Sequence, residues 1–255
     1  WYGRFYGVTL DPESEILPLI GSKEGIMHVC MTYLNPGDKV LIPNPGYPTY
    51  RSAATIAGGV CVDYLLREAN GWMPDFDEIE RQGLDGVKIM IVNFPHMPTG
   101  AAPREGLFRD LVAFARRNGI LLLHDNPYSF IRNEHPESLL ATEGAKDVAL
   151  ELNSLSKSHS MAGWRIGMLA GAKERIDEVI RFKSNMDSGM FKPLQLAAVK
   201  ALSQKDDWYA QLNAEYRERQ KLAGEIFDLL GVRYDKHSGG MFLWGKIDDR
   251  EESGE

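Results

Sequence analysis

Residues 104–125 read REGLFRDLVAFARRNGILLLHD, and this stretch contains both patterns that decide the fold. From residue 104 to 118, apolar side chains recur every three or four positions, which is typical of an amphipathic helix. From 120 to 124 the sequence is short and almost wholly apolar, which is typical of a strand buried on both faces. Helices that alternate with such strands indicate a parallel sheet.

The same alternation extends over most of the chain. The predicted fold class is therefore α/β, with a mostly parallel sheet and helices on both of its faces. The other predicted strands cover residues 16–20, 39–42, 60–65, 88–92, 148–152 and 166–170. The other predicted helices cover residues 22–34, behind an N-capping serine, 48–57 and 173–186.

The pattern changes after Lys192, where the strand-like runs stop and two helical stretches follow, the second at about 206–230. Residues 232–234 and 241–247 then resemble the first strands of another sheet, before an acidic end. We expect a large domain at 1–205, and a linking helix with an incomplete small α+β domain at 206–255. Because the chain opens on Trp1 and ends before the small domain is complete, we expect a fragment that lacks both termini.

The composition excludes several classes of protein. The 255 residues are 44% apolar and 25% charged, which is enough for a sizeable core. The net charge of −7 disfavours nucleic acid and anionic membranes as partners, and no apolar run is long enough to span a bilayer. Two cysteines are too few for a disulfide framework, which predicts a cytoplasmic protein. The six histidines are scattered, so we expect no metal site.

A lysine in a loop of small residues is the first candidate for chemistry. Neither common glycine-rich nucleotide motif occurs in the sequence. Instead, SLSKS at residues 154–158 follows a predicted strand and contains Lys157, and Arg165 comes eight residues later. A lysine at the carboxyl end of a strand can attack an aldehyde when it is partly desolvated. Taken alone, the pattern also fits an ordinary solvated lysine.

Two further polar side chains, Asp125 and Tyr128, follow the apolar strand at 120–124. A carboxylate there could keep a pyridine nitrogen protonated, and the phenol could bond an adjacent ring oxygen. Asp125 by itself could equally cap a turn or a helix.

Two other turns offer contacts to a phosphorylated ring. GSKEG at residues 21–25 leads from a strand into a helix, whose free N–H groups and dipole suit a phosphate, although any well-capped helix looks alike. Tyr47 lies in a loop rich in proline and glycine, where it could stack on a flat heterocycle or simply pack in the core.

Together and in this order, these groups supply different contacts to one phosphorylated pyridine aldehyde. The set resembles the fold-type-I pyridoxal-phosphate (PLP) enzymes of the class I/II aminotransferase family. Residues 93–100, NFPHMPTG, resemble that family's Asn-x-Pro-x-Asn-Pro-Thr-Gly segment. The similarity covers nearly the whole chain, and it implies PLP as cofactor and a PLP-transferase-like large domain.

The resemblance implies a role for each matched residue. Lys157 would form a Schiff base with PLP and later move a proton between the substrate α-carbon and the cofactor. Asp125 would pair with the pyridinium nitrogen, Tyr128 would bond the phenolate oxygen, and Tyr47 would stack on the ring. The matched phosphate contacts are Ser22, Lys23, Ser154 and Arg165.

The sequence departs from the family at Met97, which stands where the family has asparagine. A thioether cannot donate a hydrogen bond, and losing one to a charged partner costs about 1.5–3 kcal/mol unless His96 or Tyr128 replaces it. Met97 could instead be a flexible filler. The family's substrate-carboxylate arginine would lie beyond Glu255. SGMF at residues 188–191 resembles the segment that faces a partner's site, which implies a homodimer.

The leading interpretation is a PLP-dependent aminotransferase that exchanges an amino group between an L-amino acid and a 2-oxo acid through a Schiff base at Lys157. GSKEG and the residues before it resemble the branch with LL-diaminopimelate, alanine and aspartate aminotransferases. One alternative is an aminotransferase-like sensor domain of a transcription regulator, with a basic helix-turn-helix before Trp1. Another is a PLP enzyme of a different reaction type, such as a lyase, decarboxylase or cyclase, which the change at Met97 motivates.

Overall fold

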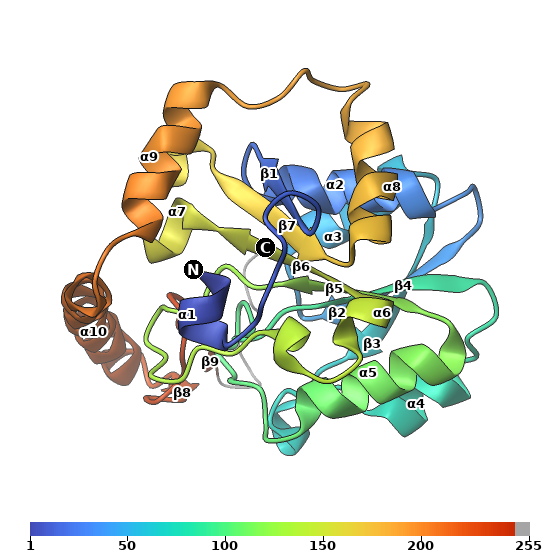
Figure 1. Cartoon of the computed structure of the whole chain (residues 1–255). Coiled ribbons are helices and arrows are strands. Elements are labelled where there is room, and N and C mark those ends of the chain that lie inside the picture. Colours follow the sequence, from blue (N-terminus) through green and yellow to red (C-terminus); the bar gives the residue numbers. More distant parts are fainter. Residues whose placement is uncertain (248–255) are drawn as a thin grey trace.

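A seven-stranded sheet forms the centre of the molecule in the computed structural model, which describes residues 1–247 (Figure 1). The acidic end at 248–255, and with it the end of the predicted second domain, lies outside the described residues. The strands are β1 (Ile16–Leu19), β2 (Lys39–Asn44), β3 (Val60–Leu65), β4 (Val87–Val92), β5 (Leu121–Asp125), β6 (Ala149–Ser154) and β7 (Gly167–Gly171). Their order is β1-β7-β6-β5-β4-β2-β3, and only β7 runs against its neighbours. This arrangement confirms the predicted α/β class.

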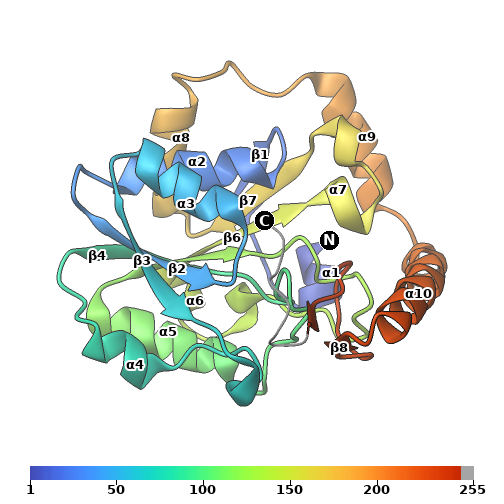
Figure 2. The same cartoon turned by 180° about the vertical axis from the view of Figure 1, so that it is seen from behind.

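Helices cover both faces of the sheet (Figures 1 and 2). The first face carries α2 (Ser22–Tyr33), α3 (Pro48–Ile56) and α8 (Lys173–Lys183). The second face carries α1 (Tyr2–Tyr6), α4 (Phe76–Arg81), α5 (Leu107–Asn118) and α6 (Ala145–Val148). Side chains of one strand alternate between the two apolar cores, so Ile89 and Ile91 pack on the first face while Met90 and Val92 pack on the second.

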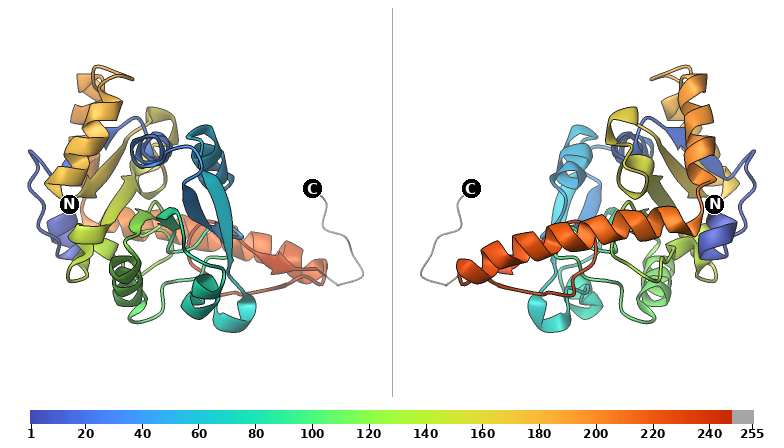
Figure 3. Two further views of the ribbon diagram at one scale, coloured as in Figure 1. Left: turned by 90° about the vertical axis from the view of Figure 1, so that its right-hand side faces the viewer. Right: turned by 90° about the vertical axis from the view of Figure 1, so that its left-hand side faces the viewer.

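Four further elements lie beside the sheet. These are α9 (Lys192–Leu202), α10 (Asp206–Leu229), β8 (Arg233–Tyr234) and β9 (Gly245–Lys246). Figure 3 shows that α10 is long and extends past the sheet. The segment after β8 returns to the large domain, because Gly239 N–H donates to the carbonyl of Gly100 (2.8 Å) and Gly240 N–H to that of Ile131 (2.9 Å). No helix of residues 1–247 has the length and apolarity to cross a membrane.

Several boundaries differ from the predicted ones for local reasons. The helix predicted at 104–118 begins at Leu107, because Gly106 has a positive φ of 77°. Ser22 does not cap α2: it is the first helical residue, and the cap position belongs to Gly21, whose φ is 82°. The strand predicted at 241–247 shortens to Gly245–Lys246, paired with β8. Helices α1, α4 and α7 (Leu155–Ser158) are too short to show a helical period in sequence.

Candidate active site

All eight predicted site residues line one cavity of about 160 Å³ at the edge of the sheet where β5 and β6 end. Loops that follow parallel strands meet at this edge, which is where ligand sites of α/β sheets gather. The predicted residues in its wall are Ser22, Lys23, Tyr47, Asp125, Tyr128, Ser154, Lys157 and Arg165.

The turn from β1 into α2 leaves helix N–H groups uncovered. No side chain caps α2 at Gly21, so the first N–H groups of this 12-residue helix keep the positive end of its dipole open. The backbone of Gly167 packs closely against this turn. A Cβ at position 167 would lie only 2.6 Å from the backbone nitrogen of Ser22. A Cβ on Gly21 would lie 2.2 Å from Nη2 of Arg165. Two glycines thus allow a guanidinium and a helix N-terminus to form one cradle suited to a phosphate.

The carboxylate of Asp125 is buried at the end of β5. Tyr50 of α3 donates its hydroxyl to Oδ2 of Asp125 (2.8 Å), whereas Oδ1 has no hydrogen-bond partner among the described residues. Burial raises the pKa of Asp125 to about 6, and the Tyr50 hydrogen bond and the neighbouring His124 oppose this rise. Among residues 1–247 the carboxylate of Asp125 accepts only from Tyr50 and caps neither a turn nor a helix, so its Oδ1 is left free to accept from a proton donor.

Lys157 lies on the one-turn helix α7 rather than in an open loop, and it is half-buried. Within residues 1–247 its amino group has no hydrogen-bond or ion-pair partner. Ser154, which the resemblance assigns to a phosphate, uses its hydroxyl to cap α7 by accepting from the N–H of Ser156 (3.2 Å). The lysine is therefore held by a capped turn and faces the same cavity as Asp125.

Aromatic rings form another wall. The ring of Tyr47 meets Tyr50 edge-on at 5.6 Å, and Nζ of Lys23 lies 5.4 Å from the Tyr47 ring centroid. Tyr128 meets Phe242 edge-on at 5.7 Å, and burial raises the pKa of its phenol. A neutral phenol and a positioned ring are what a flat heterocycle with a ring oxygen requires.

The structure corrects one expectation about His96. Its Nδ1 bonds the hydroxyl of Thr99 (2.8 Å) and its Nε2 bonds the carbonyl of Pro45 (3.1 Å), so neither nitrogen can replace the amide that Met97 lacks. Burial also lowers the pKa of His96 to about 4. Met97 and Tyr128 both line the cavity, which leaves Tyr128 as the remaining donor of the two proposed.

Sequence reasoning missed Tyr50 and Ser156. Ser156 lines the cavity, and Nη1 of Arg165 donates to its hydroxyl at 3.4 Å. Tyr50 lies three residues after Tyr47, at the start of α3. That spacing places both side chains on one side of the first helical turn, so the sequence could have indicated that Tyr50 lies near the site.

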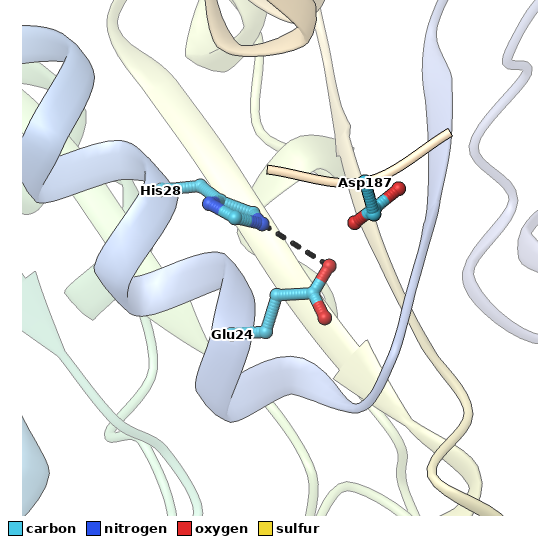
Figure 4. A group of neighbouring side chains, drawn as sticks. All are labelled: Glu24, His28 and Asp187. Atoms are coloured by element: carbon cyan, nitrogen blue, oxygen red, sulfur yellow. Dashed lines mark ion pairs between the residues drawn. The ribbon is translucent and has the colours of Figure 1, made fainter. Parts of the chain in front are cut away.

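One cluster of side chains outside the cavity has the make-up of a metal site: Glu24, His28 and Asp187 (Figure 4). However, Lys183 forms an ion pair with Asp187, and its Nζ lies 3.1 Å from Oε1 of Glu24. An ammonium group thus already balances these carboxylates. We assign the cluster to an ion-pair network that ties α2 to the segment after α8.

Comparison with known proteins agrees with this geometry. The chain is 40% identical over 257 residues to LL-diaminopimelate aminotransferase from Aquifex aeolicus, covering 100% of this chain and 66% of that protein. It therefore spans about two thirds of the length of such relatives. Among solved structures, substrate-bound BacF from Bacillus subtilis superposes with a TM-score of 0.94 at 38% identity, over 98% of this chain and 64% of BacF.

A second solved structure, a probable N-succinyldiaminopimelate aminotransferase from Thermus thermophilus, superposes with a TM-score of 0.91 at 33% identity, over 98% of this chain and 67% of that one. The family described as aminotransferase class I and II matches residues 1–253. With the sheet order, the cavity and these matches in agreement, the chain belongs to the class I and II aminotransferase family.

Proposed function

We propose that the full-length protein is a PLP-dependent aminotransferase that exchanges an amino group between an L-amino acid and a 2-oxo acid. The observation that carries this proposal is that Lys157 lines one cavity with Asp125, whose Oδ1 has no hydrogen-bond partner among residues 1–247. A nucleophilic amine and a carboxylate at opposite ends of a pyridine aldehyde are the two contacts that PLP chemistry requires.

The cavity fits PLP on features of this structure. The cradle formed by Gly21, Gly167 and Arg165 would hold the phosphate. The orphaned Oδ1 of Asp125 would bind the ring nitrogen, and Tyr128 would donate to the ring oxygen. When bound, PLP supplies a reactive aldehyde and a ring that withdraws electrons from the substrate α-carbon.

Each site residue then has a defined task. Nζ of Lys157 is the base that removes the proton from the α-carbon of the amino acid, and it carries that proton to its new position. Asp125 keeps a proton on the ring nitrogen, because an ionised carboxylate within hydrogen-bond reach raises the basicity of its partner. Tyr50 fixes the carboxylate by bonding its other oxygen. Tyr47 would orient the ring by stacking.

The test is an amino-exchange assay with the full-length protein, PLP, a panel of L-amino acids and either 2-oxoglutarate or pyruvate. The named relatives make LL-diaminopimelate the first amino donor to test. Transfer of the amino group to the oxo acid supports the proposal. Release of ammonia or carbon dioxide without amino transfer would instead indicate a lyase or decarboxylase, and PLP binding without turnover would favour a sensor domain.

Replacing Gly21 with alanine tests the phosphate cradle. The new Cβ would collide with Arg165, and alanine is strained at a φ of 82°. We expect PLP affinity to fall about tenfold or more and stability to fall by about 1 kcal/mol. Gly37→Ala is the matched control, because Gly37 has a φ of 90° with nothing within 4 Å of its Cβ position. Gly37→Ala should lose stability but keep its PLP affinity. An equal loss of PLP affinity in both variants would contradict the proposed phosphate-binding role of Gly21.

PLP binding should also depend on pH through Asp125. The pKa of this carboxyl is raised to about 6, so it becomes neutral as the pH falls through that value and loses its attraction for a protonated ring nitrogen. We expect PLP affinity to fall about tenfold for each pH unit below the midpoint. Fluorescence titrations of the PLP-free protein at a series of pH values measure the effect. Equal affinity at about pH 5 and 7 would contradict it.

We further propose that the full-length protein is a cytoplasmic homodimer. In support, Met186, Phe191, Leu196 and Val199 are exposed on α9 and the segment before it, close to the stretch that resembles the family's partner-facing segment. Both cysteines are unpaired, as is usual in a reducing compartment. Analytical ultracentrifugation tests the assembly, and a monomer at micromolar concentration would contradict it.

A further inference from the structure

The residue before Asp125, His124, is fully buried on the opposite face of β5, toward α5, where its ring lies 5.2 Å from that of Phe108. Its Nε2 lies 3.2 Å from the carbonyl oxygen of Phe94, and its Nδ1 lies 2.8 Å from Oε2 of Glu151. A carbonyl oxygen can only accept a hydrogen bond, so Nε2 must carry a proton. The charge of the ring then depends on whether the proton at the other contact belongs to Nδ1 or to Glu151.

The surroundings of Glu151 decide this question. Glu151 is fully buried on β6, directly across from His124 in the strand register. Its Oε1 accepts from the hydroxyls of Tyr2 (2.9 Å) and Ser138 (2.8 Å), and its Oε2 accepts from the N–H of Leu139 (2.8 Å). Three donors besides the histidine stabilise the ionised form of a carboxylate. These contacts favour an ionised Glu151, and with it a His124 ring that carries protons on both nitrogens.

This buried ion pair has its positive end beside Asp125. Burial is the main cause that raises the pKa of Asp125 to about 6, and the charge of His124 pulls it in the other direction. Among residues 1–247, the titratable groups near Asp125 and the pair include Lys157, which lines the same cavity, and Glu137, whose pKa is raised by burial. They also include the tyrosines Tyr2, Tyr6, Tyr50 and Tyr128. Burial raises the pKa of each of these tyrosines, so they remain neutral and do not compete as charges.

We propose that His124 is a positioning residue, held as an imidazolium by Glu151, that keeps Asp125 ionised at neutral pH so that its free oxygen can bind the protonated ring nitrogen of PLP. This role rests on the proposed function. The side chain of His124 lies on the other face of the sheet, and His124 is not among the residues that line the cavity. It acts through the electric field that it exerts on the neighbouring carboxylate, and the low dielectric of the core strengthens that field.

The first test needs no mutation and no cofactor. Nitrogen-15 NMR of the PLP-free, full-length protein reports the protonation of both ring nitrogens of His124. We expect protons on both ring nitrogens at about pH 7, where an ordinary histidine is mostly neutral. One unprotonated nitrogen at about pH 7 would overturn the proposal, whatever the enzyme does with PLP.

The second test removes the counter-charge with little change in shape. In Glu151→Gln, His124 should become neutral by NMR, and the midpoint of pH-dependent PLP binding should rise by about one pH unit. His28→Gln is the matched control, because His28 is also buried but belongs to the Glu24 cluster (Figure 4). It should leave the midpoint unchanged.

A neutral His124 with an unchanged midpoint would refute the role. Should Glu151→Gln not fold, His124→Asn carries the same prediction for the midpoint. If the wild-type protein binds no PLP at any pH, the proposed function fails, while the NMR result still decides the charge of His124. The two failures are therefore distinguishable.

Discussion

Lys157→Ala should abolish covalent attachment of PLP and lower amino exchange by about 10⁴-fold or more. The variant removes the amine of Lys157, which has no partner among the described residues, and with it the base that moves the α-proton. The second lysine in the cavity wall, Lys23, lies beside the Tyr47 ring on the phosphate side and is not expected to replace it. Loss of a positioned general base alone lowers rates by about 10² to 10⁴. Borohydride reduction of the holoenzyme followed by mass spectrometry should find PLP fixed on the peptide containing residue 157 in the wild type and on no peptide in the variant.

The control for this experiment is Lys88→Ala. Lys88 is exposed on β4 and has no partner within the described part of the chain, so its loss should leave attachment and turnover unchanged. Because Lys157 makes no hydrogen bond or ion pair among residues 1–247, its replacement should not unfold the protein. An unaltered visible absorbance of bound PLP in Lys157→Ala would end the proposal of a lysine-bound cofactor.

Asp125→Asn should lower amino exchange by about 10²- to 10³-fold while it stabilises the PLP-free protein. Asparagine keeps the shape and can still accept from Tyr50, but it cannot neutralise a protonated ring nitrogen. Removing one partner of a buried, hydrogen-bonded charge pair costs about 2–5 kcal/mol, which corresponds to that loss of rate.

Asp125→Asn should lower activity but raise stability, because the pKa of Asp125 links its proton binding to the free energy of unfolding. The pKa of Asp125 is 3.8 in the unfolded chain and about 6 in the folded protein, so the folded protein binds the carboxyl proton more tightly than the unfolded chain does. The stabilising contribution is complete below about pH 4 and is lost as the pH rises through 6, where ionisation of the buried carboxyl costs about 3 kcal/mol. Denaturant unfolding of PLP-free Asp125→Asn should therefore show its largest gain above pH 6. Asp110→Asn, on the surface, should show neither effect, and a destabilised Asp125→Asn would refute the argument.

The sequence predicts the sheet correctly and selects eight residues that line one cavity, because both depend on local patterns. A short apolar run identifies β4, β5 and β6, and their carboxyl ends identify Asp125 and Lys157 as neighbours. The resemblance to a known family adds the role of each residue. These predictions need only the rule that parallel strands end at a common edge.

Contacts between distant segments could not be predicted in the same way. The His124–Glu151 pair joins residues 27 positions apart, and it depends on the register of β5 against β6, which sequence periodicity does not give. The hydroxyl of Tyr50 reaches Asp125 across 75 positions. The expected roles of Ser22 as a helix cap and of His96 as a donor were wrong because the glycine before α2 and the carbonyl of Pro45 occupy those places.

The reversed direction of β7 has a consequence for how the chain tolerates insertions. Since β6 and β7 are antiparallel, residues 155–166 form a short arch at the rim, and this arch carries both Lys157 and Arg165. If β7 were parallel to β6, it would begin at the opposite edge of the sheet, and Lys157 and Arg165 would lie far apart. An extra residue within the arch should therefore misalign both of them at once, whereas one added to the long crossover between β5 and β6, away from the rim, should be far better accommodated.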